Sequence, residues 1–340
     1  EIWAVAEIAT GNAYAIKKGV DVDGMRQVSG EVLLRFPEFH GESGASIIRE
    51  RENYLLVPMT NEAGQLRAVQ AISEDGAVKS FMRGAQKKGT MLVIGAESFD
   101  ELIASSPSAV AYSEGVATGA SFRMASGLPV VVCFDAGNLE TVVAQTAPKL
   151  PTDLLAVLAA DNDQFHVERA LGFLSDKLGL NPHLLDGQVV NVLNGENKTR
   201  QITLGEAIAD GEWHQTAKGA YRMAMSNEEI GDAIRSVMVE IVPVGGRTIR
   251  TTFENRGLEA GRVALDALEK ANVNAVMLVP TFTSLVGRPT DWNDLHKKAG
   301  LSAVSAALQL VDELELPGIA TEIEMHGLER QRSRAMAIER

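Results

Sequence analysis

Residues 109–163 read AVAYSEGVATGASFRMASGLPVVVCFDAGNLETVVAQTAPKLPTDLLAVLAADND. The runs AVAYS, LPVVVCF and LLAVLAA are short and apolar, which is typical of buried strands. The segments between them, residues 118–126 and 138–147, have the spacing of helices. Strands that are apolar throughout and alternate with helices predict a parallel sheet covered by helices on both faces.

Acidic residues follow two of these predicted strands directly. Glu114 comes after the first strand, and Asp161 and Asp163 come after the third. Because ligands bind outside the carboxyl ends of parallel strands, we expect these three carboxylates to lie close together. Asp161 and Asp163 are two positions apart, so an extended chain points both to the same side. Such oxygen ligands suit Mg²⁺ or Mn²⁺ and an in-line phosphoryl transfer assisted by two metal ions.

Each of these features also has a structural interpretation. Taken alone, ADND at 160–163 is more typical of a turn with a capping aspartate than of a metal site. Asp135, after the second strand, either caps the next helix or serves as an additional outer metal ligand. Gly115 and Gly119 frame a strand-to-helix turn whose amides could face a phosphate, and one glycine pair is a weak signal.

The composition is that of a globular protein with about two domains, because 340 residues exceed what one hydrophobic core covers. The net charge of -13 restricts nucleic-acid binding to local basic patches. The sequence contains no signal segment and no apolar run of 18 residues, so we expect a cytoplasmic protein without membrane contact. Because the chain opens at Glu1 within a helical pattern, we interpret it as a piece of a longer protein.

Cysteine and histidine usage argues against several other chemistries. Cys133 is the single cysteine and lies inside an apolar run, which predicts a buried structural thiol and excludes disulfides and zinc fingers. The six histidines show no paired spacing of the sort that zinc requires, and no Ser-His-Asp arrangement is present.

The pattern along the chain predicts four segments. Helical spacing to about residue 50 precedes a three-stranded antiparallel meander from Tyr54, and a strand, turn, strand pattern around Gly245 predicts a hairpin. The segments are an N-terminal α+β lobe (1–95), the parallel-sheet domain (96–164 plus 255–300), an insertion (165–254) and a C-terminal helical segment (301–340).

Two stretches supply basic side chains for phosphates. KSFMRGAQKKGT, residues 79–90, combines basic residues with glycines for close backbone approach; an exposed loop kept soluble by its lysines is the structural alternative. Its candidates are Lys79, Arg83, Lys87 and Lys88. The insertion has a second basic set that favours a template clamp over a docking module or a passive elaboration, and an ordinary solvated surface is the structural alternative. This set is Lys198, Arg200, Lys218, Arg222, Arg247 and Arg250.

Taken together, SEGVATGAS, LPVVVCFDAGNLE and LLAVLAADND resemble the TOPRIM domain of the TraC-like primases of plasmid conjugation. The resemblance implies a Rossmann-like parallel sheet flanked by helices, with Glu114, Asp161 and Asp163 as catalytic metal ligands. NRGLEAGRVAL resembles the closing helix of that family. PTDWNDLHKKAGL resembles its signature, which maps onto Asp291, Asn293 and Asp294 beside Trp292. The insertion departs from the family, in which about a dozen residues are expected between the DxD pair and the closing helix.

The resemblance implies a DNA primase that makes short primers on single-stranded DNA from ribonucleoside triphosphates, with Mg²⁺ or Mn²⁺ as cofactor. It further implies a role in plasmid conjugation and replication, with other proteins of those processes as candidate partners. Two alternatives remain open. A TOPRIM nuclease would use the same carboxylates on water, and a catalytically silent nucleic-acid-binding module would use them for a structural metal.

Overall fold

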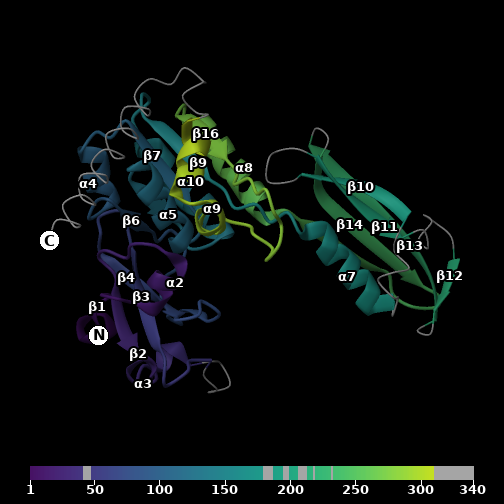
Figure 1. The fold of residues 1–340 in the computed structure, drawn as a ribbon, viewed down its shortest axis with the longest axis horizontal. Helices are drawn as coiled ribbons and strands as arrows, with labels where there is room; N and C mark the ends of the chain where they lie inside the picture. Colours follow the sequence, from purple (N-terminus) through teal and green to yellow (C-terminus); the bar gives the residue numbers. More distant parts are fainter. Residues whose placement is uncertain are drawn as a thin grey trace. The chain divides into compact units, whose positions relative to one another are not determined.

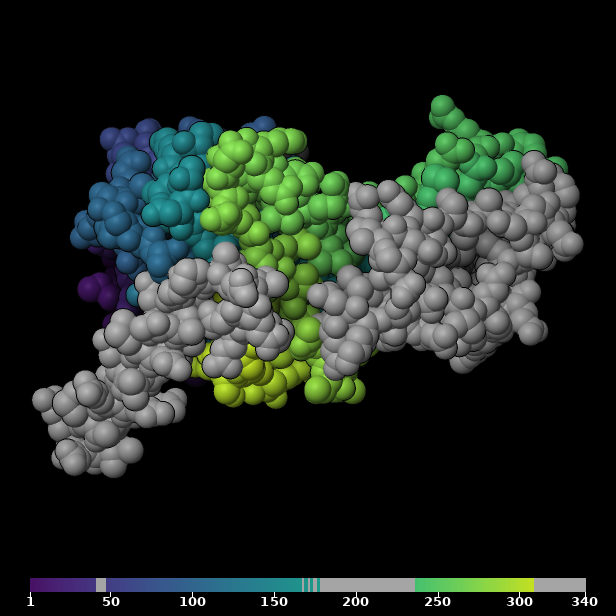
Figure 2. Space-filling model, turned by 90° about the horizontal axis from the view of Figure 1, so that it is seen from above, coloured from purple at the N-terminus to yellow at the C-terminus, as the bar shows by residue number. Residues whose placement is uncertain are grey.

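The computed structural model describes residues 1–40, 47–178, 187–193, 199–205, 213–216, 219–230 and 233–309 (Figure 1). Figure 2 shows in colour those residues whose side chains are described as well. The chain divides into two compact units. The first contains Glu1–Ala160, Ala260–Leu278 and the described residues from Trp292, and the second contains Asp161–Glu259 and Val279–Asp291. The four segments expected from the sequence stay a prediction.

The first unit begins with an antiparallel sheet in which the strands follow one another in chain order. The meander expected from Tyr54 onward is confirmed, because β3 pairs with β4 and β4 pairs with β5. The strands are β1 (Glu7–Ile8), β2 (Arg26–Ser29), β3 (Asn53–Thr60), β4 (Leu66–Ser73) and β5 (Lys79–Phe81).

The first 50 residues are not the purely helical cap that their spacing predicts. The described part of this segment contains four short helical segments, yet β1 and β2 lie between them and β2 pairs with β3. Residues 47–52 are not helical, and residues 43–46 of the same predicted helix lie outside the described residues. Strands of two and four residues are too short to show an alternating pattern. The helical segments are α1 (Ile2–Val5), α2 (Ala13–Lys18), α3 (Gly30–Leu33) and the 3₁₀ turn η1 (Pro37–Phe39).

A second sheet in the first unit has the order β16-β9-β7-β8-β6. Four strands are parallel, and β6 pairs antiparallel with β8 at one edge. This is the mixed α/β arrangement expected from residues 109–163. The strands are β6 (Leu92–Ile94), β7 (Ala109–Ser113), β8 (Val130–Val132), β9 (Leu155–Ala159) and β16 (Asn274–Leu278).

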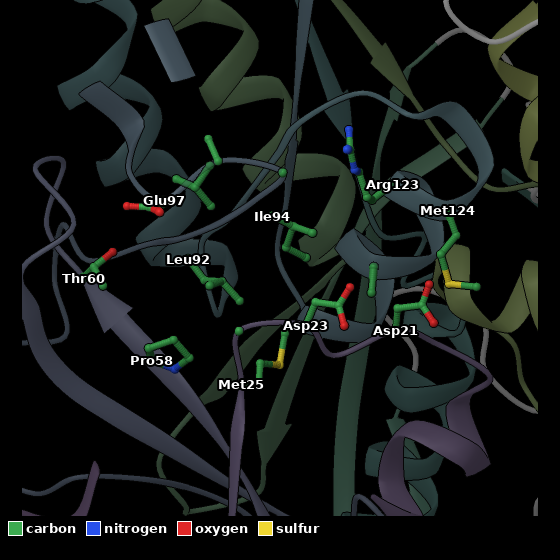
Figure 3. A pocket seen from close by; sticks show the side chains of 15 residues that line it. Asp21, Asp23, Met25, Pro58, Thr60, Leu92, Ile94, Glu97, Arg123 and Met124 are labelled. Atoms are coloured by element: carbon green, nitrogen blue, oxygen red, sulfur yellow. The ribbon is translucent and has the colours of Figure 1, made fainter. Parts of the chain in front are cut away.

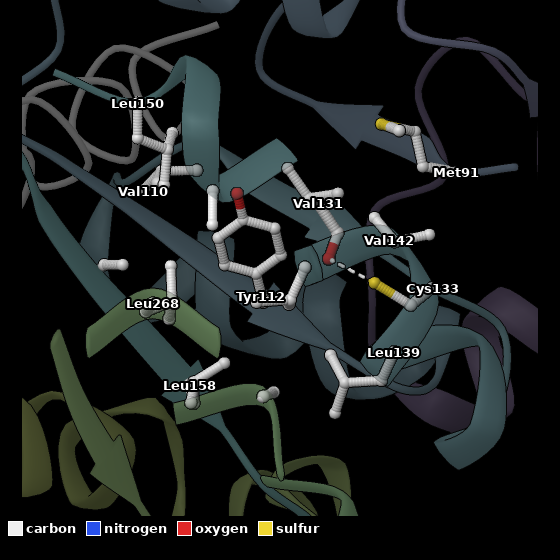
Figure 4. Close-up of a cluster of buried hydrophobic side chains, with 14 of the residues drawn as sticks. Met91, Val110, Tyr112, Val131, Cys133, Leu139, Val142, Leu150, Leu158 and Leu268 are labelled. Carbon is white, nitrogen blue, oxygen red and sulfur yellow. Dashed lines mark hydrogen bonds between the residues drawn. The ribbon is translucent and has the colours of Figure 1, made fainter. Parts of the chain in front are cut away.

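Helices cover both faces of this sheet. On one face, α4 (Phe99–Ala104), α6 (Ala136–Thr146, followed by the turn η2, Ala147–Lys149) and α8 (Arg256–Lys270) enclose a buried apolar cluster around Tyr112 (Figure 4). The Tyr112 hydroxyl lies 3.0 Å from Thr146 Oγ1, and burial raises the pKa of Tyr112. The other face is covered by α5 (Val116–Ser126), with α9 (Trp292–Ala299) and α10 (Leu301–Gln309) packed on it.

The second unit contains a separate, mainly antiparallel sheet of order β11-β10-β14-β13-β12, with β15 paired to β14. The hairpin predicted around Gly245 is confirmed by the pairing of β14 with β15. Helix α7 packs on this hairpin, and Phe173 lies 5.5 Å from Phe253 between ring centroids. The elements are α7 (His166–Leu178), β10 (Gly187–Leu193), β11 (Thr199–Gly205), β12 (Trp213–Thr216), β13 (Gly219–Ile230), β14 (Ala233–Pro243) and β15 (Ile249–Glu254).

Candidate active site

The carboxyl edge of the parallel sheet is where acidic residues accumulate. Strand β7 lies between β8 and β9, and Ser113 pairs with the last residue of each neighbour, so the three strands end level. Glu114 follows β7 by one residue and Asp135 follows β8 by three. Ala160 follows β9 and leads into Asp161, where the second unit begins. Glu114 and Asp135 therefore follow two adjacent strands of the first unit, and the chain continues from the third strand into Asp161.

Metal binding by these residues stays a prediction. Among the residues that the structure describes, no group of three or more His, Cys, Asp or Glu side chains is arranged to hold a metal ion. The carboxylate donors themselves are the type that Mg²⁺ and Mn²⁺ prefer. Gly115 is the N-cap residue of α5, as expected for the strand-to-helix turn, and its proposed phosphate contact is likewise a prediction.

Cys133 is a buried thiol whose pKa is affected by two acidic residues that follow the strands. Cys133 is fully buried, and its Sγ donates to the carbonyl oxygen of Val131 at 3.7 Å (Figure 4). Burial raises the pKa of Cys133 well above its usual value, and the charges of Glu114 and Asp135 raise it further. The predicted burial of Cys133 is confirmed.

Asp135 uses its two carboxylate oxygens for different contacts. Oδ1 accepts a hydrogen bond from the backbone N–H of Asn138 at 2.9 Å, so Asp135 caps helix α6. Oδ2 forms an ion pair with Nζ of Lys87. The helix-cap interpretation of Asp135 is confirmed, and its role as an outer metal ligand stays a prediction.

The basic loop, defined here as residues 82–90, meets the edge through this ion pair. Lys87 Nζ also lies 4.0 Å from the ring centroid of Phe81, which packs edge-to-face against Phe134 at 6.4 Å. The other basic candidates of the stretch are exposed and form no ion pair among the described residues. They are Lys79, Arg83 and Lys88. Three cations are therefore available to solvent while the fourth is neutralised.

Two substitutions of Asp135 distinguish the stability that comes from the helix cap from the stability that comes from the ion pair. Asparagine keeps the acceptor for Asn138 N–H, whereas alanine removes it. An exposed ion pair contributes about 0–1 kcal/mol and a cap about 1 kcal/mol. We expect Asp135→Ala to lower the free energy of unfolding by about 1 kcal/mol more than Asp135→Asn does. Urea unfolding of both variants measures the difference, and equal losses would contradict the cap assignment.

Two asparagines hold the backbone between Asp161 and Asp163 within the second unit. Asn255 Oδ1 accepts from the N–H of Asp163 at 2.9 Å, and Asn255 Nδ2 donates to Asn162 Oδ1 at 3.0 Å. Asn162 is fully buried, and its N–H donates to the carbonyl of Thr290 at 2.6 Å. Sequence reasoning assigned no role to Asn162. Its position between two aspartates was the available signal, because a buried amide needs partners.

Gly257 fits against the backbone of Asp161. A Cβ atom at position 257 would lie 2.2 Å from the Asp161 carbonyl oxygen and 2.9 Å from its Cβ. Only glycine therefore allows helix α8 to begin this close to Asp161. The NRGLE sequence thus supplies one residue that binds this segment, Asn255, and one that leaves room for it, Gly257.

The DWNDL segment contributes packing and hydrogen bonds in the first unit. Trp292 is buried, and its Nε1 donates to the carbonyl of Ala160 at 3.1 Å, directly before Asp161. Asn293 Nδ2 donates to the Lys18 carbonyl at 2.8 Å and to Ser121 Oγ at 3.0 Å. Asn293 therefore links α9 to α2 and α5. Asp291 belongs to the second unit and Asp294 to the first turn of α9.

A cavity of about 540 Å³ in the first unit is lined by residues outside the basic loop (Figure 3). Its lining includes residues 94–97 and the second half of α5, toward the amino end of the parallel strands. Asp21, Asp23 and Glu97 face it alongside Arg123. Because three carboxylates outnumber one guanidinium, this cavity disfavours phosphate.

The second basic set lies in the second unit. Lys198 and Lys218 fall outside the described residues, and Arg200 and Arg222 belong to strands β11 and β13. Arg247 and Arg250 are exposed on the β14–β15 hairpin, where Arg250 pairs with Glu240. The template clamp stays a prediction.

Part of this chain is similar in sequence to two proteins that are named DNA primases. It is 32% identical over 124 residues, 36% of its length, to a protein named DNA primase TraC from Escherichia coli. A second Escherichia coli protein of the same name is 32% identical over 121 residues, 35% of the chain. Both matches relate this part of the chain to primases. The matched segments make up 8% and 11% of those two relatives, so the similarity covers a small part of each.

Other comparisons give no further assignment. No model of a protein family matches this chain, and no solved structure matches it. Among the described residues, none of the helices combines the length and apolar character needed to span a bilayer.

Proposed function

We propose that this chain is the catalytic part of a DNA primase that joins ribonucleoside triphosphates into short primers on single-stranded DNA. The observation that supports this most directly is the 32% identity to DNA primase TraC over about a third of the chain. The level ends of β7, β8 and β9, each followed by a carboxylate, agree with the TOPRIM arrangement that the sequence resembles. A role in plasmid conjugation and replication belongs to the same proposal.

Glu114, Asp161 and Asp163 are the proposed ligands of Mg²⁺ or Mn²⁺. Bound there, such ions would activate the attacking 3′ hydroxyl and neutralise charge on the departing pyrophosphate. The protein's own residues hold the backbone of the two aspartates in position. Asn255 fixes the backbone of Asp163 by a hydrogen bond of 2.9 Å. Trp292 fixes the carbonyl of Ala160 next to Asp161.

Residues 79–90, which comprise strand β5 and the basic loop, are the proposed site for the triphosphate. The exposed cations Lys79, Arg83 and Lys88 offer charge-assisted hydrogen bonds to phosphate oxygens, which stabilise the charge that develops during transfer. Lys87 is a further candidate, because the Asp135 carboxylate that neutralises it is surface-exposed and competes with phosphate in water. The single-stranded template is expected to follow local basic surface, since the chain as a whole is acidic.

Primer synthesis without an added primer is the direct test. Circular single-stranded DNA is incubated with labelled ribonucleotides and Mg²⁺ or Mn²⁺, and the products are sized on a denaturing gel. We expect short labelled products that disappear when EDTA removes the metal and reappear when metal is restored.

Three other outcomes would contradict the proposal in distinct ways. Cleavage of the template without incorporation would indicate a nuclease that uses the same carboxylates on water. Binding of DNA without either reaction would indicate a silent binding module. Synthesis that continues in EDTA would contradict the metal site while leaving the primase intact.

A further inference from the structure

The side chain of Asn138 makes three hydrogen bonds that join helix α6 to the end of the basic loop. Its Oδ1 accepts from the N–H of Gly89 at 2.8 Å. Its Nδ2 donates to the carbonyl of Thr90 at 2.8 Å and to the carbonyl of Cys133 at 2.7 Å. Asn138 is 4% exposed, so water cannot replace these partners. One buried amide thus connects the loop, the helix and the end of β8.

The loop segment that Asn138 binds is rigid on its other side as well. The N–H of Thr90 donates to the carbonyl of Lys87 at 3.1 Å, and Thr90 Oγ1 donates to the same carbonyl. Thr90 is 1% exposed. Gly89 has a φ of +77°, and a Cβ there would lie 2.6 Å from Gln145 Oε1 on α6. The turn from Lys87 to Thr90 is therefore fixed by both hydrogen bonding and close packing.

The two lysines at the head of this turn have no comparable support of their own. Lys88 is exposed, and among the described residues the side chain of Lys87 contacts only Asp135, in an exposed ion pair, and the ring of Phe81. Surface ion pairs contribute little free energy. The place at which the two ammonium groups meet a ligand is therefore set by the backbone turn, and the turn depends on Asn138.

We propose that Asn138 is a positioning residue for triphosphate binding, which fixes the backbone of residues 87–90 so that Lys87 and Lys88 meet the phosphates together. This inference rests on the proposed function for its consequence in catalysis. It assigns Asn138 no contact with the nucleotide. The effect is one of preorganisation, because a turn that is already fixed in its binding geometry loses less conformational freedom when the phosphates bind.

Two variants and a control on the same helix test the role. Asn138→Ala removes all three hydrogen bonds. Thr90→Val removes only the hydroxyl bond to Lys87 and keeps the shape of the side chain, so it loosens the turn without emptying the site. Thr141→Ala is the control, because Thr141 Oγ1 bonds only to Gly137 within α6. Melting temperatures establish which proteins are folded before the comparison.

Three measurements are made on each folded protein. Amide hydrogen exchange reports on Gly89, calorimetry reports the affinity for inorganic tripolyphosphate, and primer synthesis gives KM for ATP and kcat. For Asn138→Ala we expect exchange of the Gly89 amide and Kd for tripolyphosphate each to rise about tenfold or more. We expect KM for ATP to rise similarly while kcat changes less, since lost ground-state contacts appear in KM. Thr90→Val should follow in the same direction with smaller changes, and Thr141→Ala should match the wild type.

The outcomes separate this inference from the primase proposal. A fall in kcat with unchanged KM would show a merely structural role and overturn the inference, as would faster exchange at Gly89 without loss of tripolyphosphate affinity. Failure of the wild type to bind tripolyphosphate overturns it too. If the wild type makes no primers but Asn138→Ala loses tripolyphosphate affinity, the primase proposal fails and the inference stands. If the wild type makes primers and Asn138→Ala has a normal KM, only the inference fails.

Discussion

Asp161→Asn is expected to reduce primer synthesis about 100- to 1,000-fold, the range seen when a single electrostatic contributor to a transition state is removed. Asparagine keeps the volume and one oxygen of the side chain but removes the negative charge that a divalent cation needs. Because Asp161 lies at the junction where β9 leads into the second unit, the substitution leaves the sheet pairing of β9 untouched.

Asp153→Asn is the matched control for charge. Asp153 is exposed in the turn before β9, so the variant has the same net charge as Asp161→Asn without altering the sheet edge. Initial rates of ribonucleotide incorporation are measured over a range of Mg²⁺ concentrations. A wild-type rate in Asp161→Asn, or an equal loss in Asp153→Asn, would remove Asp161 from the site.

Gly257→Ala is expected to be nearly as damaging, although it adds one methyl group. That group would lie 2.2 Å from the Asp161 carbonyl oxygen, a distance at which the backbone has to move. A displacement of about 1 Å in Asp161 predicts a loss of activity of about 100-fold. Overpacking of a close contact typically lowers the free energy of unfolding by about 1–3 kcal/mol.

Gly172→Ala is the control for Gly257→Ala, because it replaces a glycine by alanine without creating a steric clash. Gly172 lies in α7, and a Cβ there would meet no atom within 4 Å. Alanine at a helix interior is expected to raise the free energy of unfolding by about 0.5–1 kcal/mol and to leave activity unchanged. Urea unfolding and incorporation rates are compared for both variants. Full activity in Gly257→Ala would mean that the position of Asp161 is not critical.

The parallel sheet could be predicted from the sequence because its signal is local. Each of β7, β8 and β9 is an uninterrupted apolar run, and burial on both faces imposes that pattern directly. Strand β2 has only four residues, and one of them is buried, so no periodicity marked it. The predicted helical cap failed for this reason.

The contacts that organise the candidate site could not be predicted in the same way. Asn255 and Asn162 are 93 positions apart, and Asn138 reaches Gly89 across 49. Neither spacing leaves a trace in a single sequence, because the partners meet only after the sheets have formed. The carboxylates themselves could be recognised in the sequence, because they directly follow the apolar runs that form the strands.

The hydrogen bond between Asn162 and Asn255 has a consequence for how such a chain can acquire new parts. It closes a loop of 93 residues, because Asn162 follows strand β9 and Asn255 precedes helix α8. The entropy cost of closing a flexible loop rises only with the logarithm of its length, by about 0.6 kcal/mol for each doubling. A short connection at this point could therefore grow into a folded module with little thermodynamic resistance, provided that its two ends kept these asparagines.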